Sequence, residues 1–275
     1  MPGKGLYSGN PMNRRTTLLM FAALAAAQPA QADAGASLAQ AAFDRPIGRD
    51  LTTLGRMELV DRGRAPRVRE LITYRVDRGR GETAYLVRFL EPRDIAGTGL
   101  LSLNRVDGSN EQSLYLPELD RVRRIAGDRK GGRFVGSDLY YEDLQERKPA
   151  RDRHRLIGRE TVNGIACEIL ESTPLDAADS VYLKRISWID PQTLLAYRID
   201  YFERDPAAPS KRWELLAHKR IQGYWTATDS RVTDLNTGHS TRLTVEKAVY
   251  DRRLPAKLFT PQALADEALE SEYRP

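Results

Sequence analysis

From Glu70 onward, apolar and polar residues alternate in short runs. Alternation with a period of two residues is typical of β-strands that bury one face. Turn-forming residues separate the runs, as in Asn163-Gly164 and Asp190-Pro191. The pattern predicts strands at Leu71 to Val76, Thr83 to Leu90, Leu100 to Val106, Gln112 to Leu116, Arg121 to Ile125, Arg155 to Glu160, Ala166 to Glu171, Lys184 to Ile189, Ala196 to Phe202, Trp213 to Ile221, Thr226 to Thr233 and Ser240 to Val249.

Helical signals are few. The sequence predicts a short helix at Leu38 to Asp44, one that Ser137 caps and that runs through Glu146, and one that Thr260-Pro261 opens. Three short helices are too few for a layered α/β fold. We therefore expect residues 33–275 to form a single, mainly β domain. Its architecture is an incompletely closed antiparallel β-barrel, or half-barrel, of about ten to twelve strands with a few covering α-helices and a ligand-holding interior.

The N-terminus has the pattern of an export signal. Arg14 and Arg15 precede an apolar run from Leu18 to Ala27, and Ala30-Gln31-Ala32 is a small-x-small cleavage motif. The run is about half of the ~20 residues that a membrane-spanning helix needs. Residues 1–32 are therefore predicted to be a signal peptide, cleaved near Ala32, and the mature protein is expected in the periplasm. The true start is open between Met1 and Met12.

Charge changes once the signal is removed. The full chain has 43 Lys and Arg against 38 Asp and Glu. Without Lys4, Arg14 and Arg15 the balance is 40 against 38, a formal charge of +2. A nearly neutral, exported chain with interleaved acids argues against nucleic acid as a partner. Its local arginine clusters allow transient contact with an anionic membrane surface or an acidic partner.

Two sequence strings carry a family resemblance. One is Leu116-Pro117 followed by Arg121 to Ile125, and the other is Phe134 to Asp138 followed by Tyr141 to Leu144. The chain resembles the outer-membrane lipoprotein-sorting (LolA/LolB-like) family, in the branch associated with RND-type permeases. The resemblance, which spans about Leu71 to Leu264, implies a half-barrel that encloses acyl chains in an apolar cavity. It also implies lipid or lipoprotein as cargo and an inner-membrane RND-type permease as partner.

An acyl-chain cavity needs an apolar lining spread over several strands, because each methylene removed from water contributes ~0.8 kcal/mol. Aromatic and aliphatic residues recur at alternate positions of the predicted strands, although they would fill an ordinary core equally well. The cavity candidates are Ile72, Tyr74, Tyr85, Val87, Phe89, Trp188, Tyr197, Ile199, Tyr201 and Trp213.

A glycine-rich stretch suggests a lid. Four glycines lie between residues 127 and 136, so the following segment could swing over the cavity. The lid candidates are Phe134, Leu139, Tyr140, Tyr141 and Leu144. A polar latch is predicted to pair Asp138 and Asp143 with Arg121, Arg123 or Arg124. The alternative is that Asp138 caps the helix and Asp143 is solvated.

Enzyme motifs are missing from the sequence. His154, His218 and His239 lie on separate elements without metal-ligand spacing, and there is no Gly-x-Ser-x-Gly elbow or phosphate loop. We expect no enzyme activity, no metal and no cofactor. Cys167 is expected to act as a small buried hydrophobe.

Two functions stay open at this point. The first is a periplasmic lipid or lipoprotein carrier, a monomer by default, that takes part in outer-membrane biogenesis. The alternative is a periplasmic sensor or docking module that binds a signalling or permease protein without moving lipid, since the same half-barrel also occurs in a regulator of an anti-sigma factor. Bound cargo distinguishes the two.

Overall fold

Antiparallel strands make up about half of the described chain. The computed structural model describes Met1, Gly3 and residues 33–275. The predicted signal peptide, with its cleavage site near Ala32, lies outside the described residues apart from Met1 and Gly3. The strands are β1 (Asp50–Val60), β2 (Arg67–Gly79), β3 (Glu82–Glu91), β4 (Gly99–Asn104), β5 (Asn110–Leu116), β6 (Arg121–Arg124), β7 (Asp152–Val162), β8 (Ile165–Pro174), β9 (Lys184–Ile189), β10 (Ala196–Phe202), β11 (Lys211–Ile221), β12 (Tyr224–Asp234) and β13 (Ser240–Tyr250).

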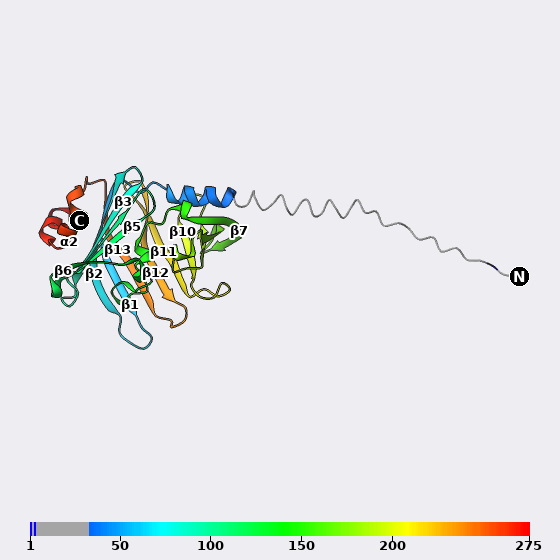
Figure 1. Ribbon diagram of the computed structural model, residues 1–275, viewed down its shortest axis with the longest axis horizontal. Coiled ribbons are helices and arrows are strands. Elements are labelled where there is room, and N and C mark those ends of the chain that lie inside the picture. Colours follow the sequence, from blue (N-terminus) through cyan, green and yellow to red (C-terminus); the bar gives the residue numbers. More distant parts are fainter. Residues whose placement is uncertain (2, 4–32) are drawn as a thin grey trace.

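All thirteen strands form one sheet in the order β6-β5-β4-β3-β2-β1-β13-β12-β11-β10-β9-β8-β7 (Figure 1). Two meanders, β1 to β6 and β7 to β13, join where β1 pairs with β13. Strands β6 and β7 are the two edges and do not pair, so the sheet stays unclosed. The prediction of a mainly β, incompletely closed antiparallel sheet is confirmed, with thirteen strands instead of about ten to twelve.

The additional strand is β1. Its inward positions include Thr53 and Gly55 beside Met57 and Leu59, so its apolar alternation is weak in the sequence. Gly55 has a specific steric role, because a Cβ there would lie 2.0 Å from the Thr244 carbonyl oxygen on β13. The register of the β1–β13 pair shifts between Leu54 and Gly55. Close backbone approach at this irregularity therefore requires glycine.

Residues 125–151, which we call the crossing segment, connect the two edges of the sheet. Its Phe134 and Leu139 pack against Met57, Leu71 and Phe89, which come from β1, β2 and β3. We call the sheet face that this segment covers the inner face. The chain has to pass from one edge of the sheet to the other because β6 and β7 lie at opposite ends of the strand order.

The C-terminal segment covers the opposite, outer face of β2 to β5. Leu258, Phe259 and Leu264 pack there against Ile72 and other residues of these strands. Figure 1 shows this segment, in red, against the side of the sheet that carries β2 and β6. The segment comprises η7 (Ala256–Leu258), α2 (Pro261–Leu264) and η8 (Glu267–Tyr273). The C-terminal helix predicted at Thr260-Pro261 is thus a single α-helical turn that the Thr260 side chain caps.

A buried ion pair ties the C-terminal segment to β3. The side chains of Arg88 and Glu270 are both 0% exposed, and Arg88 Nη2 lies 2.6 Å from Glu270 Oε1. Arg88 Nη2 also donates to the Leu264 carbonyl at 2.8 Å. Burial raises the pKa of Glu270, and the hydrogen bonds from Arg88 oppose that shift. The sequence alternation places Arg88 on the outer face, between Leu86 and Leu90.

An N-terminal helix covers the other end of the sheet. Residues 33–43 are helical, and Leu38 and Ala39 pack against Leu170 on β8 and Ile189 on β9. Figure 1 shows this helix, in blue, near β7 and β10. Within the described ranges, no helix combines the length and apolar character needed to cross a membrane.

Candidate functional site

The crossing segment has no long helix. It contains the short turns η2 (Gly127–Arg129), η3 (Phe134–Gly136), η4 (Glu142–Leu144) and η5 (Pro149–Arg151); η1 (Pro117–Leu119) and η6 (Ala177–Asp179) lie outside it. The helix expected from Ser137 through Glu146 is therefore wrong. Val135 and Gly136 have positive φ angles of 50° and 72°, and the Ser137 hydroxyl bonds to the Phe134 carbonyl. Such side-chain bonds to nearby backbone compete with helix formation.

The crossing segment places an apolar side on the inner face of the sheet. Phe134 is 1% exposed and lies 5.6 Å from the Phe89 ring, between ring centroids. A cavity of about 290 Å³ separates part of the segment from the sheet. Its lining is mainly apolar and includes Met57, Leu71 and Val87 from the sheet, with Leu139 and Leu144 from the segment.

Asp143 fastens the crossing segment to the second meander. Its Oδ2 atom lies 2.6 Å from Lys211 Nζ on β11, and its Oδ1 atom accepts a 2.6 Å hydrogen bond from the Tyr182 hydroxyl. The Tyr140 backbone N–H also donates to Asp143 Oδ2 at 2.7 Å. The side chains of Lys211 and Asp143 are 3% and 7% exposed. The alternative reading of a solvated Asp143 therefore does not describe this structure.

Aromatic rings surround the Lys211 ammonium. Its Nζ lies 3.7 Å from the centroid of Tyr140, 4.8 Å from that of Tyr182 and 4.9 Å from that of Tyr201. The negative ring faces and the Asp143 carboxylate together stabilise a cation that has lost its water. Burial lowers the pKa of Lys211, and Asp143 opposes that shift. Burial and then Glu203 raise the pKa of Tyr140 to about 12, so the phenol stays protonated at neutral pH.

Asp138 makes a second attachment. Its side chain is 1% exposed and accepts hydrogen bonds from Thr241 Oγ1 at 2.7 Å and from Arg133 at 2.8 Å. His239 Nδ1 lies 2.6 Å from the same carboxylate. Burial lowers the pKa of Arg133, but Asp138 and Asp234 raise it above the ordinary arginine value. The crossing segment is thus held at Asp138 to β13 and at Asp143 to β11.

The predicted arginine partners of these aspartates lie elsewhere. Arg121, Arg123 and Arg124 belong to the exposed edge strand β6. Among the ion pairs of the described residues, none joins these arginines to Asp138 or Asp143. In the structure, Asp143 instead pairs with Lys211, and Asp138 contacts Arg133 and His239. These partners come from the second meander and from the segment itself, so only the tertiary structure reveals them.

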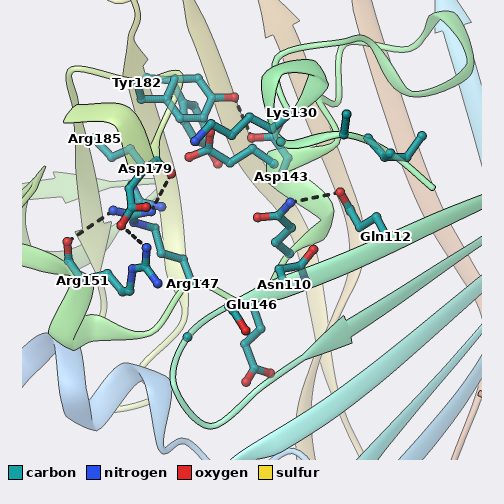
Figure 2. A pocket seen from close by; sticks show the side chains of 18 of the residues that line it. Asn110, Gln112, Lys130, Asp143, Glu146, Arg147, Arg151, Asp179, Tyr182 and Arg185 are labelled. Carbon is teal, nitrogen blue, oxygen red and sulfur yellow. Dashed lines mark hydrogen bonds and ion pairs between the residues drawn. The ribbon is translucent and has the colours of Figure 1, made fainter. Parts of the chain in front are cut away.

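A larger, polar cavity of about 820 Å³ lies beside the Asp143 attachment (Figure 2). Figure 2 shows Arg147, Arg151 and Arg185 gathered on one side of it, around Asp179, with Asn110 and Gln112 on the other side. Arg147 Nη2 lies 2.7 Å from Asp152 Oδ1, and Arg185 contacts the same carboxylate. Arg151 is paired with Asp179.

The structure distributes the ten predicted cavity residues over several cavities and core clusters. Val87 lines the 290 Å³ cavity, and Tyr85 and Val87 line a neighbouring one of about 210 Å³. Ile199 and Trp213 line a further cavity of about 320 Å³ beside the N-terminal helix. Phe89 packs on the crossing segment, whereas Tyr201 lines the polar cavity.

Four of the ten lie away from these cavities. Ile72 and Tyr74 are on the outer face, where Tyr74 donates to the Glu270 carbonyl. Trp188 and Tyr197 belong to a separate core cluster with Cys167, which is 1% exposed. Alternation shows which residues share a face but not which face is inner, and the C-terminal segment makes both faces of β2 apolar. The inner side of β2 carries Leu71 and Thr73 instead.

Sequence reasoning missed Lys211 and Tyr182. One signal was available, because Lys211 occupies the same strand phase as Trp213 and Leu215, where an apolar residue is expected. A charged residue in an apolar phase indicates a buried ion pair. The described residues contain no group of three or more His, Cys, Asp or Glu side chains that could hold a metal ion.

Comparison with known proteins identifies the relatives of this architecture. A family model described as an uncharacterized protein matches residues 81–266. The sequence has no significant match among curated proteins. A structure described as an outer membrane lipoprotein-sorting protein domain from Vibrio parahaemolyticus is 28% identical, with a TM-score of 0.80 over 85% of this chain and 99% of that chain.

Two other solved structures have the same fold. A DUF1329 family protein from Desulfovibrio piger is 29% identical, with a TM-score of 0.80 over 85% of this chain and 99% of that chain. A LolA superfamily protein from Nitrosomonas europaea is 17% identical, with a TM-score of 0.63 over 82% of this chain and 96% of that chain. The chain therefore belongs to the family whose model matches residues 81–266, and its structural neighbours are outer membrane lipoprotein-sorting, LolA-like domains and DUF1329 family proteins.

Proposed function

We propose that this protein is a periplasmic carrier that shields the acyl chains of a lipid or lipoprotein on the inner face of its sheet. The observation that carries the proposal is the apolar cavity between the sheet and the crossing segment. Acyl chains have no polar groups to recognise, so a carrier for them needs contiguous apolar surface. The cavity provides it from both its walls.

The size of the cavity bears on how cargo would enter. At about 290 Å³ it lies at the lower end of ligand pockets, which range over roughly 300–1,000 Å³. Phe134, Leu139 and Leu144 of the crossing segment occupy the space above Met57 and Leu71. Displacing these three side chains would enlarge the cavity and expose apolar sheet surface. Acyl chains would then replace the apolar contacts that the side chains make.

The attachments of the crossing segment suit such a movement. Asp138 and Asp143 hold it through polar contacts, and the backbone between Gly127 and Gly136 includes the positive-φ positions 135 and 136. These polar contacts can exchange with water when the segment moves, and acyl chains would cover the apolar surface that the movement exposes. We expect the segment to act as the lid of the carrier.

The remaining parts of the proposal concern setting and partners. The predicted export signal supports a periplasmic location, and an inner-membrane RND-type permease is the proposed partner in outer-membrane lipid trafficking. Contact with the membrane surface is transient, the protein is a monomer, and its role is binding without catalysis, cofactor or nucleic acid. The description of the Vibrio relative as a lipoprotein-sorting domain supports this reading.

The first test is mass spectrometry of organic extracts from the mature protein, purified gently from its native periplasm. We expect one enriched lipid class at close to one molecule per protein. A protein without lipid that still co-purifies with a permease or a signalling protein would contradict the carrier and favour a sensor or docking module.

A further inference from the structure

Three cavities follow one another along the inner face, and their character changes from polar to apolar. The polar cavity of about 820 Å³ and the cavity of about 210 Å³ share Asp143 and Gln145. The latter shares Val87 and Leu144 with the apolar cavity of about 290 Å³. A molecule that extends through all three would be amphiphilic, with its polar end beside the crossing segment's Asp143.

The charges around the polar cavity do not cancel. The charged side chains that line it and their ion-pair partners number seven cations and five carboxylates. One carboxylate, Asp152, serves both Arg147 and Arg185. The cavity therefore carries an excess of positive charge, which favours an anionic ligand.

Two cations in the lining have no carboxylate partner among the described residues. Lys130 Nζ donates to the Ala178 carbonyl at 2.5 Å, which is a neutral partner. Arg124 is exposed at the end of the edge strand β6 and lines the cavity, whereas its neighbour Arg123 does not. A guanidinium and an ammonium at one cavity are a common arrangement for binding phosphate.

Amide groups provide neutral hydrogen-bonding partners in the same cavity. Gln145 Nε2 donates to Gln112 Oε1 at 3.0 Å, and Asn110 Nδ2 donates to Asn104 Oδ1 at 2.6 Å. The buried Asn110 Oδ1 atom accepts no hydrogen bond. The amide side chains that line the cavity can pair with hydroxyl groups of a ligand. A phosphate that carries a glycerol has both the charge and the hydroxyls.

We propose that the polar cavity binds the anionic phosphoglycerol headgroup of a lipid, with Arg124 and Lys130 as the phosphate contacts and the adjoining cavities holding the acyl chains. The inference rests on the proposed lipid carrier and adds to it the class of cargo. Because Lys130 belongs to the crossing segment and Arg124 to β6, the headgroup bridges the lid to the edge of the sheet.

The test compares two lipids with the same acyl chains. Delipidated mature protein is incubated with vesicles of phosphatidylglycerol or of phosphatidylcholine, separated from them, and its retained lipid is quantified. We expect phosphatidylglycerol to be retained at least about tenfold better, a ratio that corresponds to about 1.4 kcal/mol. The double variant Arg124→Ser, Lys130→Ser should reduce this retention to the phosphatidylcholine level, and the control Arg123→Ser should leave it unchanged.

Other outcomes overturn the inference in distinguishable ways. Equal retention of both lipids would reject the headgroup site and leave the carrier intact. Retention of neither lipid would reject the carrier, and the headgroup inference with it. Saturable binding of free glycerol 3-phosphate without retention of any lipid would assign the cavity to a soluble phosphate and also overturn the proposal.

Discussion

At the scale of single residues, the ion pair between Asp143 and Lys211 holds the crossing segment. Asp143→Asn would leave the buried ammonium without its carboxylate. Loss of one partner of a buried pair costs about 3 kcal/mol or more. We expect the lower end of this range, because burial already lowers the pKa of Lys211 and lets it lose its proton. Urea denaturation measures the loss, and proteolysis of the glycine-rich loop should accelerate with it.

The matched control restores neutrality at the same place. Asp143→Asn combined with Lys211→Met removes both charges and should recover most of the lost stability, because no unpaired cation stays buried. Unchanged lipid retention together with unchanged protease sensitivity in Asp143→Asn would argue against a latch at this position.

The Asp200 carboxylate contributes to the loss of folding stability at low pH. Its burial favours a higher pKa, but hydrogen bonds from Arg198 and Arg212 hold the pKa of this carboxyl below its ordinary value of 3.8. A carboxyl whose pKa is lower in the folded than in the unfolded state stabilises the fold at any pH above its unfolded-state pKa. This stabilisation disappears as the pH falls through the folded-state pKa. Asp200→Asn should therefore be less stable than the parent at pH 7, and the difference should vanish in strong acid. Equal stabilities at pH 7 would refute this assignment.

At the scale of elements, the seam between β1 and β13 joins the two meanders. Gly55→Ala places a methyl group 2.0 Å from the Thr244 carbonyl oxygen, a distance that the backbone must relieve by moving. We expect a destabilisation of about 1–3 kcal/mol, the usual cost of overpacking. Thermal unfolding measures it, with Gly127→Ala as the control because a Cβ there meets no atom within 4 Å. Similar melting temperatures for both variants would contradict the steric role of Gly55.

At the scale of the whole molecule, the cavities of the inner face are continuous enough for one substitution to affect two of them. Ala227 lines both the 290 Å³ and the 320 Å³ cavities. Ala227→Phe should fill this space and reduce lipid retention several-fold, with little loss of stability because the cavities can accept the ring. Retained lipid is measured by mass spectrometry.

The neighbouring Thr228 lines neither cavity, so Thr228→Phe is the control for a bulky residue on β12. Full lipid retention by Ala227→Phe, in a protein that folds normally, would move the acyl-chain site away from these cavities. Equal losses in both variants would indicate a general defect of the strand.

The sequence by itself determined that this chain is built mainly of short antiparallel β-strands, because a period of two residues and turn residues are local properties. It also marked residues 134 to 144 as a separate segment with apolar and acidic side chains after a glycine-rich stretch. It did not reveal β1, whose inward threonine and glycine interrupt the alternation. It also predicted a helix in the crossing segment, where local side-chain bonds and positive φ angles prevail.

Only the tertiary structure decided which face of each strand is the inner one and which cations meet the aspartates. Ile72 and Tyr74 share a face as predicted, but the C-terminal segment lies on that face. Lys211 lies 68 residues from Asp143 and reaches it because the crossing segment spans the inner face. Alternation along a strand contains no information about partners from distant strands. Long-range strand order supplies that information, and the candidate site is built from it.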